Sequence, residues 1–436
     1  AMMVAARLLQ GVAGALLTPG SLAVIQASFR PTDRGRAIGT WAGIGAIAPA
    51  MGPPLGGWLA AAAGYERCIA LAPRQPALHF NLGTALEKAG DLGRAVGAYL
   101  AAWRLNPKDA RLALFAGAAL EAAGRREDAA TLFSIGDDLD PAVRLAKDRP
   151  GLDPEIRRRS ATADRVMREH FTRLHERAVD DFARGVAQPG SPPALARVRA
   201  AIWVQTHDRP FTYRTPAQKP SLFYMPDLPA REFTPRQELS WAADVESHTA
   251  AIRDEYLAAV AGGAQHAPYV EAGARSPLWR ELRGNPDWSA LHLYKLAEAT
   301  ALAKQFPKTL AALAAADVVR IAGKPMELFF SRLKPGTHIP PHYGIANNRI
   351  TVHLPLIVPG DCEIRVGGNR HRWREGELVA FDDSFEHEAW NRAASDRVVL
   401  IFEAHHTDLA PLERAAIQHA IDARGRWLRE RRVPER

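Results

Sequence analysis

The sequence predicts a multidomain protein of the mixed α + β class, and three observations along its 436 residues support this prediction. Two long uncharged runs near the start predict an N-terminal apolar helical hairpin. A periodicity of 34 residues in the next segment predicts α-helical repeats. Short β-rich runs separated by turn signals in the C-terminal part predict a jelly roll or a small barrel. A chain of this length has room for about three domains.

The first predicted element is the hairpin of residues 1–64. Residues 8–29 and 37–65 contain no charged side chain, and each run is long enough to span a bilayer. The stretch from GVAGALLTPG to PLGGWL resembles about two helices of a major facilitator superfamily drug exporter. Carriers of that kind place the substrate path between two multi-helix halves. Two helices are too few for this, so transport is excluded as the function.

The second element is a repeat over residues 65–142. The residues that keep the 34-residue interval are Pro73, Pro107 and Pro141, together with Tyr65, Tyr99 and Phe133. Small residues at Gly83 and Gly117 fall in step with them. The pattern resembles tetratricopeptide repeats, of which the first copy is truncated. Such repeats would dock a peptide or protein; the alternative is a spacer packed on the rest of the chain.

Two further helical segments complete the α part of the prediction. Residues 143–220 read as a charged helical linker, clearest from 157 to 181 and broken by prolines at 192 and 193. Residues 411–436 read as a C-terminal basic helix. The arginines of these helices are scattered rather than arranged in one stripe with interleaved aromatics. The formal net charge of +8 therefore indicates a solvated helical surface, and no nucleic-acid partner is expected.

The last element is a β-rich domain over residues 221–410. The runs that predict strands are 326–333, 349–358, 362–366, 378–381 and 397–404. Turn signals such as Lys334-Pro335-Gly336 and Pro359-Gly360-Asp361 separate them. Closely spaced strands of this kind close into a jelly roll or a small barrel.

Chemistry in this domain centres on two histidines. His342 and His387 lie 45 residues apart, and Arg397 follows ten residues after the second. Two neutral imidazoles with open positions beside them suit Fe(II), and an arginine can grip a carboxylate with a bidentate fork. The usual facial triad has an acid two residues after the first histidine, but here that position is Gly344. The set predicts an iron and 2-oxoglutarate oxygenase with a vacant acid-ligand position.

The stretch from Ser331 to His405 resembles the aspartyl/asparaginyl β-hydroxylase family, which uses two histidines and has glycine at the acid position. The resemblance extends from about Pro220. It implies a double-stranded β-helix with His342 and His387 as the iron ligands. It also implies that Arg397 binds the distal carboxylate of 2-oxoglutarate, helped by Ser331 and His353. With O2, such an enzyme hydroxylates the β-carbon of an aspartyl or asparaginyl side chain in a peptide or protein.

One position departs from the family pattern. Where the animal enzyme has a second arginine two residues before His353, this chain has Thr351. Arg349 lies two residues further upstream on the same side of the predicted strand, which makes it the candidate substrate-binding residue. Two other functions stay open. One is a lipid A acyl-chain hydroxylase with the same iron site; the other is a non-enzymatic repeat scaffold for protein interaction.

Several other residues have structural explanations. We expect His338, His371, His405 and His406 to be surface or core residues, and Trp279, Trp288 and Tyr294 to pack in a core rather than form a cleft. Asp382 and Asp383 are expected to shape a turn or support the site, not to bind the metal.

The membrane topology of the hairpin conflicts with this chemistry. The basic loop of residues 30–36 should stay in the cytoplasm, which would deliver residue 66 onward to the far side of the membrane. Iron(II) and 2-oxoglutarate are scarce there. We therefore interpret residues 1–64 as a fusion relic, which also suits Ala1 in place of Met. The two distant cysteines, Cys68 and Cys362, fit a reducing compartment, so a cytoplasmic protein is expected. The alternative is inner-membrane anchoring through residues 8–65.

Overall fold

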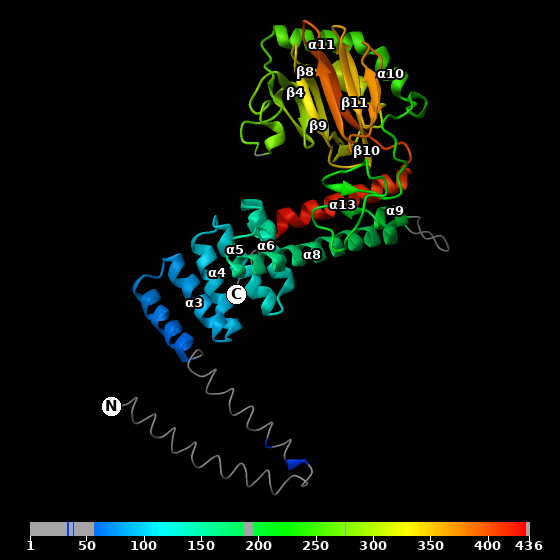
Figure 1. Cartoon of the computed structure of the whole chain (residues 1–436). Coiled ribbons are helices and arrows are strands. Elements are labelled where there is room, and N and C mark those ends of the chain that lie inside the picture. The colour runs from blue at the N-terminus through cyan, green and yellow to red at the C-terminus, as the bar shows by residue number, and fades with distance from the viewer. Residues whose placement is uncertain (1–32, 35–37, 39–55, 187–194, 275, 433–436) are drawn as a thin grey trace. The chain divides into compact units, whose positions relative to one another are not determined.

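The structure is a computed structural model that describes residues 33–34, 38, 56–186, 195–274 and 276–432 (Figure 1). Most of the predicted hairpin of residues 1–64 lies outside the described residues; from residue 56 to residue 71 the chain is helical. In the described ranges, no helix combines the length and the apolar character that a membrane span needs. The chain divides into two compact units, 1–166 with 432–436, and 167–431.

The first unit is built from antiparallel helical pairs. Its helices are α3 (Pro76–Lys88), α4 (Leu92–Leu105), α5 (Ala110–Ala122), α6 (Arg126–Leu139), α7 (Ala142–Leu145), the 3-10 helix η1 (Ala146–Asp148) and the first half of α8 (Pro154–Val186). Each pair turns at a glycine in the left-handed region, Gly90 with φ of 84° and Gly124 with φ of 79°. Asp91 and Asp109 accept backbone N–H groups at the starts of α4 and α5.

The 34-residue interval corresponds to one close contact inside each helical pair. A Cβ atom at Gly83 would lie 2.7 Å from the ring of Tyr99, and one at Gly117 would lie 2.6 Å from the ring of Phe133. Only glycine lets the aromatic ring of the second helix lie against the backbone of the first. The small and aromatic residues that set the sequence period therefore pack directly on each other.

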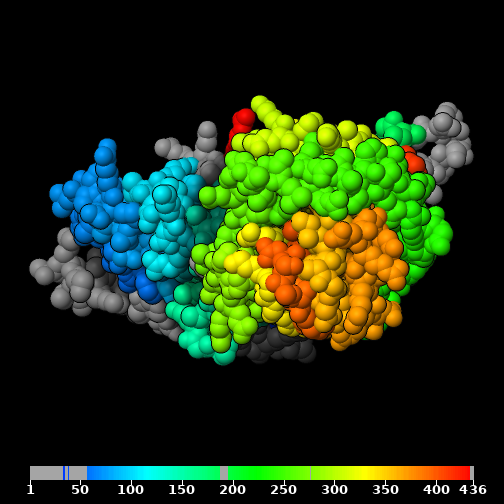
Figure 2. Space-filling model, turned by 90° about the horizontal axis from the view of Figure 1, so that it is seen from above, coloured from blue at the N-terminus to red at the C-terminus, as the bar shows by residue number. Residues whose placement is uncertain are grey.

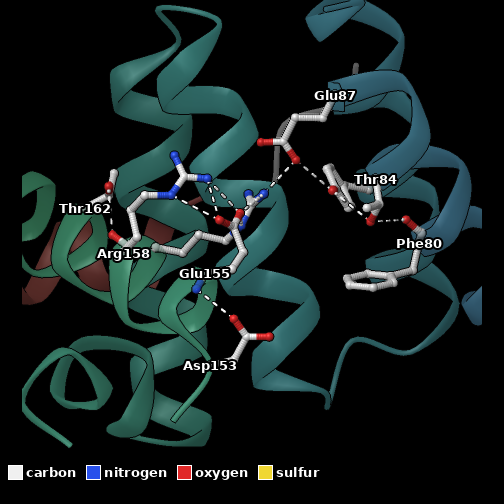
Figure 3. Close-up of polar contacts among 9 residues, drawn as sticks. Phe80, Thr84, Glu87, Asp153, Glu155, Arg158 and Thr162 are labelled. Carbon is white, nitrogen blue, oxygen red and sulfur yellow. Dashed lines mark hydrogen bonds and ion pairs between the residues drawn. The ribbon is translucent and has the colours of Figure 1, made fainter. Parts of the chain in front are cut away.

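A buried ion-pair network joins α8 to α3 within this unit (Figure 3). Glu87 accepts hydrogen bonds from the Tyr99 hydroxyl at 2.8 Å and from Arg159 at 2.6 Å. Arg159 is buried, and its guanidinium also donates to Glu155 at 2.7 Å. Glu155 in turn accepts from Arg158 on the solvent side. The buried guanidinium of Arg159 thus has two carboxylate partners, Glu87 and Glu155, as a buried charge requires.

The second unit contains two antiparallel sheets that lie face to face (Figure 1). The larger sheet has the order β13-β10-β15-β8-β4-β3, with β5 paired to β4; the smaller has the order β12-β11-β14-β9. The strands of the larger sheet are β3 (Ala267–Pro268), β4 (Trp288–Lys295), β5 (Glu298–Ala299), β8 (Glu327–Leu333), β10 (Arg349–Ile357), β13 (Val379–Phe381) and β15 (Arg397–His405). Those of the smaller sheet are β9 (His338–His342), β11 (Cys362–Val366), β12 (Asn369–Arg372) and β14 (His387–Asn391).

Alternation along the large sheet separates two faces. Phe330 and Phe402 point to one face, where they pack with Ile252 and Tyr256 of the covering helices. These helices are α10 (Ala242–Ser247), α11 (Thr249–Ala261), α12 (Pro307–Ala312) and the 3-10 helix η4 (Ala301–Gln305). In the space-filling view, green side chains of the helical part lie directly beside the orange side chains of the strands (Figure 2). The opposite face of the large sheet points toward the small sheet.

Another core of this unit joins its helical segments to a short strand pair. It gathers Val179 of α8, Val198, Phe223 and Ile417. The elements are the second half of α8, α9 (Ala196–Arg199), β1 (Ile202–Trp203), β2 (Phe223–Tyr224) and α13 (Pro411–Glu430). The remaining short elements are the 3-10 helices η2 (Arg236–Glu238) and η3 (Pro277–Trp279), with β6 (Arg320–Ile321) and β7 (Lys324–Pro325).

Candidate metal and co-substrate site

A cavity of about 340 Å³ lies between the two sheets. It is lined on the large sheet by alternate residues of β8, β10 and β15, and on the small sheet by residues of β9, β11 and β14. The volume is in the range of small-molecule sites. The cavity contains every residue that the sequence predicted for the site: His342, His387, Arg397, Ser331, His353, Arg349 and Gly344.

The two histidines are cross-strand partners. His342 ends β9 and His387 begins β14, and their ring centroids lie 4.0 Å apart. The Nδ1 atom of His342 lies 2.8 Å from the carbonyl of Pro340, and that of His387 lies 3.0 Å from the carbonyl of Phe385. A proton on each Nδ1 leaves each Nε2 with a free lone pair. Burial lowers the pKa of His342 to about 3 and that of His387 to about 4, so both rings are neutral.

Arg397 lies at the start of β15 with only 1% of its surface exposed. Within the described residues, its Nε and Nη1 atoms have no hydrogen-bond partner. Its guanidinium lies over the ring of Trp373 at 4.7 Å. Burial lowers the pKa of Arg397 to about 10, which still leaves it charged at neutral pH. A buried cation without an anion is costly, so the site fits a ligand that brings a carboxylate.

Ser331 and His353 line the same part of the cavity as Arg397. The Ser331 hydroxyl accepts a hydrogen bond from Nε1 of Trp288 at 3.2 Å. His353 packs edge-on against Phe381, and no other described residue gives its buried Nδ1 a hydrogen-bond partner. Burial, with the charge of Arg397, holds the pKa of His353 well below its ordinary value. The two residues therefore leave polar atoms available to a ligand seated on Arg397.

Gly344 lies against the carboxylate of Asp383. A Cβ atom at position 344 would lie 2.2 Å from Cγ of Asp383, and the Gly344 N–H donates to the Asp383 carbonyl at 2.6 Å. The Thr351 hydroxyl donates to Oδ2 of Asp383 at 3.2 Å. Burial raises the pKa of Asp383. Asp382 instead accepts from Gln218 and from the backbone of Ser384, as a turn residue does.

The wall beyond Asp383 carries charges that sequence reasoning missed, Glu403 and Glu327. Nε of Arg349 lies 2.9 Å from Oε1 of Glu403, and both side chains are largely buried. Glu327 accepts from the backbone of Leu296 at 3.0 Å. The alternation of side chains along a strand could have indicated both acids. Glu403 follows Arg397 by six residues on β15, so both point to the same face of the sheet. The predicted substrate residue Arg349 is therefore already paired.

Aromatic residues form the side of the cavity next to His342. The ring of Trp279 lies 5.0 Å from that of His342, and Trp288 lies beside it. The sequence favoured core packing for both tryptophans. Trp288 belongs to a buried core cluster and Trp279 packs against it, and both also line the cavity. Tyr294 does pack against the core beneath the helices. Tyr269, which stacks on Trp288 at 4.1 Å, also lines the cavity and was not foreseen.

The remaining predicted histidines lie elsewhere: the residues that line the cavity do not include His338, His371, His405 or His406. His338 stacks on Trp390 and lies 2.8 Å from a carboxylate oxygen of Glu388. Over the described part of the chain, no three His, Cys, Asp or Glu side chains converge as a metal-binding group. A metal at His342 and His387 would thus have two protein ligands.

Comparisons with known proteins agree with both resemblances. Residues 246–407 match the family model described as Aspartyl/Asparaginyl beta-hydroxylase, and residues 1–72 match that of the Major Facilitator Superfamily. The chain is 29% identical over 231 residues to aspartate beta-hydroxylase domain-containing protein 2 of Xenopus tropicalis, covering 51% of this chain and 60% of that protein. It is 36% identical over 138 residues to the aspartyl/asparaginyl beta-hydroxylase of Mus musculus, covering 31% of this chain and 18% of that protein.

A bacterial lipid enzyme is also similar. The chain is 44% identical over 77 residues to the ornithine lipid ester-linked acyl 2-hydroxylase of Rhizobium tropici, covering 17% of this chain and 27% of that protein. The matches thus span between 18% and 60% of the length of these relatives.

Proposed function

We propose that this chain, which carries an aspartyl/asparaginyl β-hydroxylase domain, is an Fe(II)- and 2-oxoglutarate-dependent dioxygenase. Its substrate would be an aspartyl or asparaginyl side chain of a peptide or protein, hydroxylated at the β-carbon. One observation carries the proposal. Two neutral histidines with free Nε2 atoms share a cavity with a fully buried arginine that no described side chain pairs.

The residues of the cavity fit both absent groups. His342 and His387 would hold the metal through Nε2, which leaves open positions for the co-substrate and for O2. Arg397 would bind the distal carboxylate of 2-oxoglutarate, and Ser331 and His353 would supply further hydrogen bonds. When bound, Fe(II) and 2-oxoglutarate supply the oxidising chemistry: O2 and 2-oxoglutarate become CO2 and succinate as a substrate C–H becomes C–OH.

The surrounding residues would orient the reactants and keep water out. The rings of Trp279, Trp288 and Tyr269 cover the cavity beside His342 and would limit access of solvent. Trp288 also fixes the Ser331 hydroxyl by donating to it. Asp383 takes the space beside Gly344, so a side chain at position 344 would collide with its carboxylate.

The other segments of the chain are proposed to be separate structural modules. We infer a double-stranded β-helix for the β-rich part of residues 221–410, because two antiparallel sheets enclose the cavity. We infer tetratricopeptide repeats for residues 65–142 from the repeated glycine–aromatic contacts, with a peptide-docking role. Residues 143–220 would link the two, residues 411–436 would be a basic C-terminal segment that begins with helix α13, and residues 1–64 would be a fusion relic. The chemistry and the lack of paired cysteines favour the cytoplasm.

Hydroxylation of a lipid acyl chain is the second candidate function. The cavity lining includes Leu296, Met326 and Ile345, which suit an alkyl chain as well as a peptide. The similarity to the acyl hydroxylase of Rhizobium tropici points the same way.

One experiment separates the candidates. The purified full chain is incubated with Fe(II), 2-oxoglutarate and O2, and with either asparaginyl and aspartyl peptides or vesicles that contain acylated bacterial lipids. Mass spectrometry then detects the gain of one oxygen atom. Oxygen gain in the peptides supports the first function, and gain only in the acyl chains supports the second. Absence of succinate in every arm, including the arm without substrate, would leave a non-enzymatic scaffold and contradict the proposal.

A further inference from the structure

The two ends of the cavity differ in charge. Arg397 and Glu403 lie on the same face of β15, six residues apart, which corresponds to about 20 Å along the strand. The Arg397 end carries a cation that no described side chain pairs. At the Glu403 end, Arg349 is held by an ion pair with Glu403, and Glu327 and Asp383 add two more acids. One end therefore receives an anion, and the other repels one.

Each positively charged side chain of the described cavity lining already has a partner or a proposed ligand. Among the residues that line it, the positively charged side chains are Arg349 and Arg397, because the three histidines are neutral. If Arg397 binds the co-substrate, only Arg349 is left for a substrate carboxylate. Its charge is opposed by Glu403 at 2.9 Å. A substrate carboxylate on this wall would face acids without a free cation.

The wall also offers a buried hydrogen-bond acceptor. Oε2 of Glu403 is buried and lacks a hydrogen-bond partner among the described residues. A buried acceptor of this kind is satisfied by an N–H or O–H of a ligand. A carboxamide supplies two such N–H donors, whereas an ionised carboxylate supplies none.

We propose that this acidic wall selects the asparaginyl over the aspartyl side chain as the substrate. The inference rests on the proposed oxygenase function and deepens it by naming the substrate class. Thr351 supports the same preference for asparagine. Its hydroxyl donates to Asp383, and its uncharged side chain cannot pair with a substrate carboxylate. A neutral amide can seat against Glu403 without the repulsion that a carboxylate meets.

The test compares two peptide mixtures that share randomised flanks and differ only in a central Asn or Asp. Binding to the full chain is measured in the presence of Fe(II) and 2-oxoglutarate without O2, so that affinity is read separately from turnover. The signal is tryptophan fluorescence, since Trp279 and Trp288 line the cavity. We expect the Asn mixture to bind about tenfold more tightly, the effect of one unfavourable charge contact. Oxygen gain on admission of air should follow the same order.

Variants locate the cause of the preference. Glu403→Gln frees Arg349 and should raise the affinity for the Asp mixture about tenfold, so that the two affinities become similar. Glu327→Gln keeps an oxygen that can accept from Leu296 and should act in the same direction more weakly. Glu377→Gln, which makes the same change of charge at an exposed ion pair, should leave the preference unchanged.

Equal or tighter binding of the Asp mixture by the unmodified protein would overturn the inference. So would a preference that neither Glu403→Gln nor Glu327→Gln moves, or failure of both mixtures to bind. The proposed oxygenase function is judged separately, by conversion of 2-oxoglutarate to succinate, and can stand when the inference about asparagine fails.

Discussion

The carboxylate of Asp383 lies where a side chain at position 344 would have to stand, 2.2 Å from the place of a Cβ atom on Gly344. The backbone holds the two residues together, because the Gly344 N–H donates to the Asp383 carbonyl at 2.6 Å. Glycine at position 344 is therefore required by the packing against Asp383.

The first prediction follows from that contact. Gly344→Asp restores the residue type of the usual triad, yet it should weaken Fe(II) binding, because the new side chain displaces Asp383 and adds a like charge beside it. Iron affinity of the purified variant is the measurement. The double variant with Gly344→Asp and Asp383→Gly removes the clash and should bind iron better than Gly344→Asp alone. A single variant that binds iron more tightly than the unmodified protein would show that Gly344 is incidental.

The second prediction concerns Arg397. Arg397→Met should weaken 2-oxoglutarate binding about 100-fold, the loss of a bidentate charged contact of roughly 3 kcal/mol. The same variant should not lower the free energy of unfolding of the ligand-free protein, because it removes a buried charge that lacks a described partner. Calorimetric titration and urea denaturation measure the two effects. Arg374→Met, at an exposed arginine, is the control. Marked destabilisation of ligand-free Arg397→Met would show that the arginine has a structural partner.

The third prediction concerns the first unit. Gly117→Ala places a Cβ atom 2.6 Å from the ring of Phe133 and should destabilise the unit by about 1–3 kcal/mol. Gly97→Ala is the matched control on a neighbouring helix, where a Cβ meets nothing within 4 Å. It should stabilise the protein by up to about 1 kcal/mol through helix propensity. Both changes are read from urea denaturation followed by circular dichroism. Equal effects of the two substitutions would contradict the glycine–aromatic packing.

The fourth prediction concerns residues 1–64. Their deletion should leave conversion of 2-oxoglutarate to succinate intact, because the described residues that line the cavity all lie from 269 onward. The activity of the shortened and the full chain is compared at equal protein concentration. Loss of activity on deletion, with the full chain active in membrane fractions, would mean that the segment is functional and that the fusion interpretation is wrong.

The longer strands of the two sheets were in part predictable from the sequence. The expected runs 349–358, 362–366 and 397–404 agree with β10, β11 and β15 to within one residue at each end. Apolar residues alternating with turn signals carry that information locally. Among the strands that were not predicted, β9 and β4 have identifiable physical reasons. β9 contains Pro340 and Pro341, which disfavour strand, and it lies at the edge of its sheet. β4 is separated in sequence from its longer partner β8, so their pairing is set by tertiary packing.

Cavity residues that belong to a sequence motif were predictable, whereas those that only the fold brings into the cavity were not. His342, His387 and Arg397 have fixed spacings in the chain, and the structure gathers them in one cavity. Glu403 and Glu327 look like ordinary surface charges of β-strands until the inward face of each strand is known. Tyr269 enters the cavity from a segment outside the predicted strands, because β3 brings it beside Trp288.

Joint binding of iron and 2-oxoglutarate without O2 tests the two-histidine site most directly. The full chain, His342→Ala, His387→Ala and the control His371→Ala are each titrated with Fe(II) in the presence of 2-oxoglutarate. The visible charge-transfer absorption of the chelated metal is recorded. We predict that absorption develops with one iron per chain in the unmodified protein and in His371→Ala, and is lost in both other variants. Undiminished absorption in His342→Ala or His387→Ala would contradict the two-histidine site on which the proposed function depends.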